Sequence, residues 1–124
     1  IYTEAGDTRF IGNTVIFNEK FNETYVGFEN HSGRTHIGNL TPLGKCVHGY
    51  GNNGQSGYEG CVYKNTFCTY FHGSLLSKNP ELADRLLKLA LDKKYSEEIA
   101  LTSLDDSFEL RAKEIMINRL NNKQ

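Results

Sequence analysis

His72 is the residue of this chain with the clearest catalytic potential. It follows a run of β-branched and aromatic residues (66–71) that is typical of a strand, and it precedes Gly73 and a segment leading into a helix. In α/β folds, sites form at the carboxyl ends of strands. A neutral imidazole there can accept a proton from a thiol and later return it to a leaving group. A capping or core histidine fits the same position, so position alone leaves both interpretations open.

The three cysteines could act as nucleophiles, but their local sequences favour packing roles. A catalytic thiolate usually lies at a helix N-terminus or a sharp elbow, where nearby dipoles lower its pKa. Cys46, Cys61 and Cys68 all lie in strand-like runs. On one strand, Cys68 and His72 would share a face about 13 Å apart, at ~3.3 Å per residue, which is too far for direct pairing.

Two further patterns suggest ligands. The four histidines and three cysteines contain neither C-x-x-C nor H-E-x-x-H, so no metal site is predicted from sequence, although one assembled in three dimensions stays open. Residues 49–54 match G-x-G-x-x-G, but they lead into further turn residues and not into the helix that dinucleotide binding requires. Asn53-Gly54 predicts a type I′ hairpin turn instead. We therefore expect no cofactor.

Composition excludes several classes of function. The chain has 124 residues with 14 basic and 15 acidic side chains, a net charge of −1. No basic excess exists to neutralise phosphates, and no apolar run approaches the ~20 residues that span a bilayer, so neither a nucleic-acid partner nor a membrane span is expected. An odd number of cysteines favours a reducing, cytoplasmic compartment. Three glycosylation sequons, at Asn22, Asn30 and Asn39, keep a secreted glycoprotein fragment as the alternative.

The elements that position these residues change type near residue 78. Strands are expected at 14–17, 24–28, 45–48, 61–63 and 66–71. Asn79-Pro80 predicts a helix start, with the helix ending near Lys93-Lys94, and Asp105-Asp106 predicts the start of a last helix. Apolar residues at helical spacing predict that each helix has one face in the core of a single compact piece: Leu82, Leu86, Leu87, Leu89 and Leu91, then Phe108, Ala112, Ile115, Met116 and Leu120.

Two motifs of the chain resemble those of the class I glutamine amidotransferases of the cobyric acid synthase group. C-T-Y-F-H-G (68–73) is similar to their G-T-Y-L-H-G, and G-F-E-N-H-S-G (27–33) to their G-Y-E-I-H-x-G. The likeness is greater to the glutaminase (GatD) subunits of lipid II isoglutaminyl synthases. It includes Y-T-E (2–4) leading to Arg9, G-Y-G-N-N (49–53) and Y-K-N (63–65), and it covers essentially the whole chain.

The resemblance implies a fold and roles for two residues. The fold would be α/β, with residues 1–124 forming the C-terminal half of a flavodoxin-like glutamine amidotransferase domain. His72 would be the catalytic histidine, and Arg9 would hold the substrate glutamine, since a guanidinium fork matches a carboxylate with two parallel hydrogen bonds. A surface arginine beside a turn remains the alternative for Arg9. Glu29 and His31 would have supporting roles with no part in catalysis.

The chain departs from the family pattern where the nucleophile is concerned. The family's cysteine lies on a strand-to-helix elbow in the preceding half of the domain, and no cysteine here matches it. Many class I glutaminases have a glutamate two residues after the histidine, where this chain has Ser74. The chain also begins at Ile1, and its only methionine is Met116. We therefore expect a piece that holds the base but not the attacking group, and that cannot hydrolyse glutamine alone.

The resemblance also implies a partner. In the intact protein, ammonia would pass to a Mur-ligase-like subunit (MurT), which amidates the D-glutamate of lipid II to D-isoglutamine during cell-wall synthesis. Three alternatives stay open: a glutaminase for cobyric acid synthesis, a catalytically silent scaffold, and the secreted fragment named above. The sequence immediately upstream would decide whether a nucleophile exists.

Overall fold

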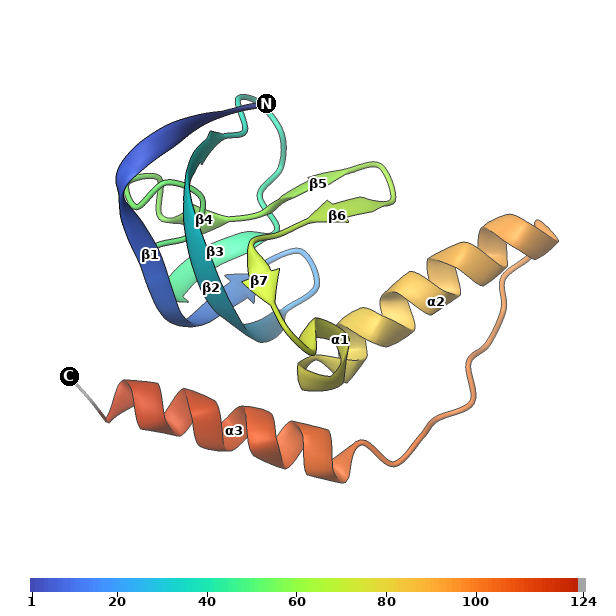
Figure 1. Ribbon diagram of the computed structural model, residues 1–124. Helices are drawn as coiled ribbons and strands as arrows, with labels where there is room; N and C mark the ends of the chain where they lie inside the picture. The colour runs from blue at the N-terminus through green and yellow to red at the C-terminus, as the bar shows by residue number, and fades with distance from the viewer. Residues whose placement is uncertain (123–124) are drawn as a thin grey trace. The chain divides into compact units, whose positions relative to one another are not determined.

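The computed structural model describes residues 1–122 and combines β-sheet with α-helix (Figure 1). The described chain divides into two compact units, residues 1–73 and the residues from Ser74 onward. The change of composition near residue 78 lies close to this boundary, but the expectation of one compact piece was wrong. No helix within residues 1–122 is long and apolar enough to cross a membrane.

A five-stranded antiparallel sheet dominates the first unit. Its strand order is β4-β3-β1-β2-β7, and a two-stranded sheet, β5-β6, accompanies it. The bounds are β1 (Tyr2–Asn18), β2 (Glu23–His36), β3 (Gly44–His48), β4 (Tyr58–Glu59), β5 (Cys61–Tyr63), β6 (Thr66–Cys68) and β7 (Phe71–His72).

The β1–β2 hairpin forms the core of this sheet. Val15 lies opposite Val26 and Ile16 opposite Tyr25, and all four side chains are fully or almost fully buried. The predicted strands 14–17 and 24–28 are confirmed, yet both strands extend far beyond these apolar segments. Backbone pairing between polar residues continues the ladder, and periodicity of apolar side chains does not reveal such pairing.

The predicted strand at 66–71 is interrupted. Thr69 and Tyr70 separate β6 from β7, and these two strands belong to different sheets. The expectation that Cys68 and His72 lie on one strand and share a face was therefore wrong. The physical reason is a buried carboxylate: Glu59 Oε1 accepts hydrogen bonds from the Thr69 hydroxyl (2.9 Å) and the Tyr70 N–H (2.6 Å).

The second unit contains three helices, α1 (Leu75–Lys78), α2 (Pro80–Tyr95) and α3 (Ser107–Asn121). The predicted helix starts are confirmed, with Asn79 and Asp106 as the N-cap residues of α2 and α3. The short α1 was not predicted.

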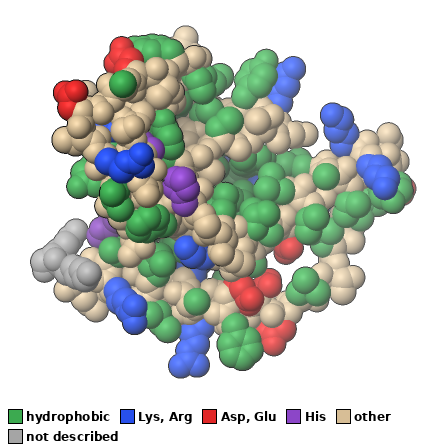
Figure 2. Space-filling view, in the orientation of Figure 1, with side chains coloured by type: hydrophobic (Ala, Val, Ile, Leu, Met, Phe, Trp, Pro, Cys, Tyr) green, Lys and Arg blue, Asp and Glu red, His purple; other side chains and the backbone are tan. Residues whose placement is uncertain are grey.

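The expectation that the apolar helix faces are mostly core was wrong for many of their residues. Leu82 is 1 % exposed, but Leu87 is 56 % and Phe108 80 % exposed, and Figure 2 shows hydrophobic side chains at the surface over the helices. The buried residue of α3 is Lys113, whose ammonium pairs with the Glu81 carboxylate. Helical spacing identifies the apolar side of a helix, but it does not determine whether another surface covers that side.

Candidate functional site

His72 lies on β7, at one edge of the five-stranded sheet. In the antiparallel pairing with β2, His72 is opposite Phe28, and Phe71 is opposite Glu29. Directly opposite residues project from the same face of a sheet, and residues alternate between faces along a strand. The His72 side chain therefore projects from the same face as Phe28 and, two residues along β2, Asn30. The imidazole is exposed on this face.

Arg9 reaches the same face from β1. Its Nη1 donates a hydrogen bond to Asn30 Oδ1 (2.8 Å), and its side chain is exposed. Two residues along a strand span about 6.6 Å and neighbouring strands lie about 4.8 Å apart, so the Cα atoms of Asn30 and His72 are about 8 Å apart. The register thus places the two sequence-predicted site residues on the same face of the sheet, on either side of β2. We call this open surface, formed by Arg9, Phe28, Asn30 and His72, the His72 face.

The backbone before Arg9 is held by Arg34. The β1–β2 register shifts between Ala5 and Phe10, which leaves a bulge on β1. Arg34 Nη2 donates hydrogen bonds to the carbonyl oxygen (2.7 Å) and hydroxyl (3.2 Å) of Thr8, and its guanidinium lies 3.5 Å from the centroid of the Phe10 ring. Arg34 thus holds the residues on both sides of Arg9, Thr8 and Phe10, and these contacts fix the direction in which the Arg9 side chain leaves the bulge.

Glu29 and His31 alternate with Phe28 and Asn30 and so project from the opposite, buried face. The Glu29 carboxylate accepts hydrogen bonds from the N–H groups of Tyr50 (2.8 Å) and Gly51 (3.1 Å). His31 Nδ1 lies 2.9 Å from the Gly33 carbonyl oxygen, and its ring stacks on Tyr70 with the centroids 3.6 Å apart. Their contacts support the loop and the strands behind the His72 face.

The same contacts explain the G-x-G-x-x-G pattern of residues 49–54. Gly49 and Gly51 have positive φ angles, and the backbone amides of this loop bind an anion, but that anion is the chain's own Glu29 carboxylate. The predicted type I′ turn at Asn53-Gly54 was wrong, since only Gly54 of the pair has a positive φ. Asn53 Oδ1 instead accepts hydrogen bonds from the Gln55 and Ser56 N–H groups.

Glu59 holds the backbone that leads into β7. Its carboxyl group accepts the two hydrogen bonds from Thr69 and Tyr70 given above. The Thr69 hydroxyl in turn accepts a hydrogen bond from the N–H of Phe71 (3.0 Å), the residue before His72. Burial raises the pKa of Glu59 from 4.5 to about 7, although the bonds from Tyr70 and Thr69 lower it. Glu59 was not singled out from the sequence, where it is one acidic residue among turn-forming residues.

Two of the three cysteines are poorly suited to nucleophilic attack. Burial, with the charges of Glu59 and Glu29, raises the pKa of Cys46 to about 12. Burial, followed by its contact with the Cys68 thiol, raises the pKa of Cys61. A thiol in such surroundings stays protonated at neutral pH, and the thiolate is the reactive form.

Comparison with known proteins decides the family. The CobB/CobQ-like glutamine amidotransferase domain matches residues 1–80, which include the whole His72 face. The chain belongs to this family.

Two of the similar proteins are named as subunits of a glutamine-hydrolysing synthase. The GatD subunit of lipid II isoglutaminyl synthase from Streptococcus pneumoniae is 52 % identical over 101 residues, 81 % of this chain and 39 % of that protein. The GatD subunit from Staphylococcus aureus is 41 % identical over 123 residues, 99 % of this chain and 49 % of that protein. A probable cobyric acid synthase from Methanothermobacter thermautotrophicus is 42 % identical over 65 residues, 52 % of this chain and 13 % of that protein. The chain thus spans less than half the length of these relatives.

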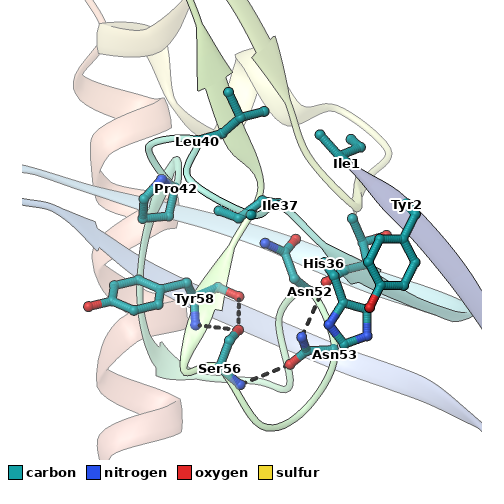
Figure 3. A pocket seen from close by; sticks show the side chains of 12 residues that line it. Ile1, Tyr2, His36, Ile37, Leu40, Pro42, Asn52, Asn53, Ser56 and Tyr58 are labelled. Carbon is teal, nitrogen blue, oxygen red and sulfur yellow. Dashed lines mark hydrogen bonds between the residues drawn. The ribbon is translucent and has the colours of Figure 1, made fainter.

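A separate pocket lies elsewhere in the first unit of this family member. It is lined in part by the stacked rings of Tyr2 and His36, by Asn52 and Asn53, and by Ser56 (Figure 3). Both amides are already engaged by the backbone: Asn53 by the bonds described above, and Asn52 by Gly60. Neither His72 nor Arg9 lines this pocket. Within residues 1–122, no group of three or more His, Cys, Asp or Glu side chains is placed to hold a metal ion.

Proposed function

We propose that this chain carries the general base and the substrate anchor of a glutaminase. The observation that supports the proposal most directly is the placement of His72 and Arg9 on one open face of the sheet. Membership in a glutamine amidotransferase family, with glutamine-hydrolysing relatives, supplies the reaction class.

Arg9 binds the α-carboxylate of glutamine in this proposal. A guanidinium has five N–H donors, and the bond from Nη1 to Asn30 uses one of them. The remaining donors suffice for a bidentate contact with a carboxylate. Asn30 holds the guanidinium in place, so Asn30 is a positioning residue that the sequence indicated only as a possible glycosylation site.

His72 moves the proton. A cysteine thiol from a part of the protein outside these residues gives its proton to the imidazole and attacks the side-chain amide carbon of glutamine. The tetrahedral intermediate collapses to a thioester as His72 returns the proton to the departing ammonia. His72 then takes a proton from water, which attacks the thioester, and the products are glutamate and the regenerated thiol. With Ser74 in place of a glutamate, either a group from elsewhere in the protein orients the imidazole or a Cys–His dyad suffices.

The same proposal includes the division of the catalytic groups between two halves of one domain. Residues 1–124 form the C-terminal half of a flavodoxin-like domain whose other half brings the nucleophile to the His72 face, so the chain alone releases no ammonia. In the whole protein, the ammonia passes to a MurT-type Mur ligase subunit in the cytoplasm. That subunit amidates the D-glutamate of lipid II. The relatives named GatD support this acceptor.

Cobyric acid amidation is the second candidate, favoured by the similarity to a probable cobyric acid synthase. The shorter region of similarity, about half of this chain, makes it the weaker of the two. The acceptor distinguishes them, because purified complex amidates either a lipid II stem peptide or a corrinoid carboxylate.

The glutaminase reaction is tested by ammonia release from glutamine, using the full-length protein with its partner. Loss of a general base lowers kcat by about 10²–10⁴-fold, so we expect His72→Asn to do so while the variant remains folded. His36→Asn is the matched control, because it makes the same change on the same sheet away from β7. If His72→Asn kept kcat within about twofold of the unaltered protein, His72 could not be the base.

A further inference from the structure

Cys61 and Cys68 face each other across the β5–β6 hairpin. They are directly opposite in the antiparallel register, and the hairpin is closed by Lys64, with φ 54°, and Asn65. Directly opposite residues in antiparallel strands have Cα atoms about 4.5 or 5.5 Å apart. Disulfides span Cα separations of about 4.4–6.8 Å. The backbone therefore already holds these two residues at bonding separation.

The two side chains also approach each other. Directly opposite residues project from the same face of a sheet, so the Cys61 and Cys68 side chains lie next to each other on one face of the hairpin. Both residues line a cavity of about 140 Å³ together with Thr69 and Tyr70. Burial differs between them: Cys61 is 3 % exposed, whereas Cys68 is exposed. An oxidant can therefore reach Cys68 from solvent, whereas Cys61 is shielded from solvent.

The third cysteine provides an internal comparison. Cys46 lies on β3, is half-buried, and is paired in register with Ile16 of β1. Neither of the other cysteines is its cross-strand partner. The hairpin pair thus has a geometry that Cys46 does not share.

We propose that Cys61 and Cys68 form a redox-active dithiol that a hydroperoxide converts to a reversible disulfide stapling the β5–β6 hairpin. The Cys68 thiolate attacks the peroxide oxygen, which yields a sulfenic acid and releases water or an alcohol. The Cys61 sulfur then attacks the Cys68 sulfur while the Cys61 thiol proton passes to the departing oxygen, so the S–O bond breaks and water leaves; no free Cys61 thiolate is needed beforehand. Two thiols are oxidised and one peroxide is reduced; a small dithiol such as dithiothreitol reverses the change.

This pair is independent of the proposed glutaminase reaction, which uses neither cysteine. The motif that the sequence shares with the glutamine amidotransferases has glycine where this chain has Cys68. The chemistry of the cysteine pair is therefore tested without any measurement of ammonia.

The test is thiol mapping of the full-length protein after exposure to hydrogen peroxide. Remaining thiols are alkylated under denaturing conditions, and peptides are analysed by mass spectrometry with and without dithiothreitol. We expect Cys61 and Cys68 to be linked, in one peptide or between two, with a mass lower by two hydrogens. Dithiothreitol should restore both free thiols. Cys46 should be alkylated in every sample.

Two variants keep the result interpretable. Cys68→Ser changes the exposed partner, so the hairpin is expected to fold and the linked peptide to disappear, leaving Cys61 fully alkylated. Cys46→Ser is the matched control and should leave the yield of linked peptide unchanged. The proposal is overturned if peroxide leaves Cys61 and Cys68 unlinked, if Cys68 stops at the sulfinic acid, or if linked peptides arise only between molecules or through Cys46.

Discussion

The buried carboxyl of Glu59 makes the stability of this protein depend on pH in a defined direction. Burial raises its pKa from 4.5 to about 7 in the folded protein. Between these values the folded state keeps the Glu59 proton and the unfolded state loses it, so the folded state binds more protons. The free energy of unfolding must then fall as pH rises from about 4.5 to about 7.

The magnitude follows from the difference between the two pKa values. At about 1.4 kcal/mol for each pH unit, the gap between 4.5 and about 7 corresponds to about 3 kcal/mol. Glu59→Gln removes the titration but keeps an oxygen that can accept the bonds from Thr69 and Tyr70. Its amide nitrogen takes the place of Oε2, which has no hydrogen-bond partner among residues 1–122, and the cost of that change does not vary with pH.

Urea denaturation followed by circular dichroism, at pH values from 4.5 to 8, measures the effect. We expect the stability of Glu59→Gln relative to the unaltered protein to rise by about 3 kcal/mol across this range. Glu19→Gln, on an exposed turn residue, controls for the loss of one carboxylate. If the difference between Glu59→Gln and the unaltered protein stays constant with pH, Glu59 is ionised throughout and the reasoning from burial is wrong.

Three further changes test other parts of the structure. Leu82→Ala should cost about 3 kcal/mol of stability in urea denaturation because Leu82 is buried, whereas Leu87→Ala should change it by less than about 0.5 kcal/mol; equal effects would contradict the described burial of α2. Gly27→Ala should destabilise by about 1–3 kcal/mol, since the new Cβ would lie 2.3 Å from Phe71 Cγ, while Gly12→Ala meets open space and should leave the melting temperature nearly unchanged. Arg9→Lys should raise KM for glutamine about tenfold or more with a smaller change in kcat, because an ammonium cannot make the bidentate contact. The exposed Arg111→Lys is its control, and an unchanged KM in Arg9→Lys would remove Arg9 from the substrate site.

Local signals in the sequence predicted the elements that depend on local interactions. Asn79-Pro80 and Asp105-Asp106 identified two helix starts because residue preferences at the first turn of a helix are local, although neither Asn79 nor Asp106 makes a side-chain capping hydrogen bond. The strand at 61–63 was predicted with the bounds that the structure has. The family was identified because its motifs retain their order along the chain.

Long-range contacts account for what the sequence did not predict. The break between β6 and β7 depends on Glu59, which is ten residues from Thr69 in sequence and has no local signature of burial. The role of Asn30 depends on the bulge that brings Arg9 over β2. The exposed side chains of Leu87 and Phe108 share the spacing of core residues, and only the three-dimensional packing separates them from Leu82.

A structure of the full-length His72→Asn protein with glutamine bound is the most direct measurement, since the substitution stops turnover while leaving Arg9 intact. We predict that the α-carboxylate of glutamine accepts two hydrogen bonds from the Arg9 guanidinium, and that the side-chain amide lies between residue 72 and a cysteine from outside this chain. Glutamine bound away from β7, with Arg9 contacting only Asn30, would contradict the account.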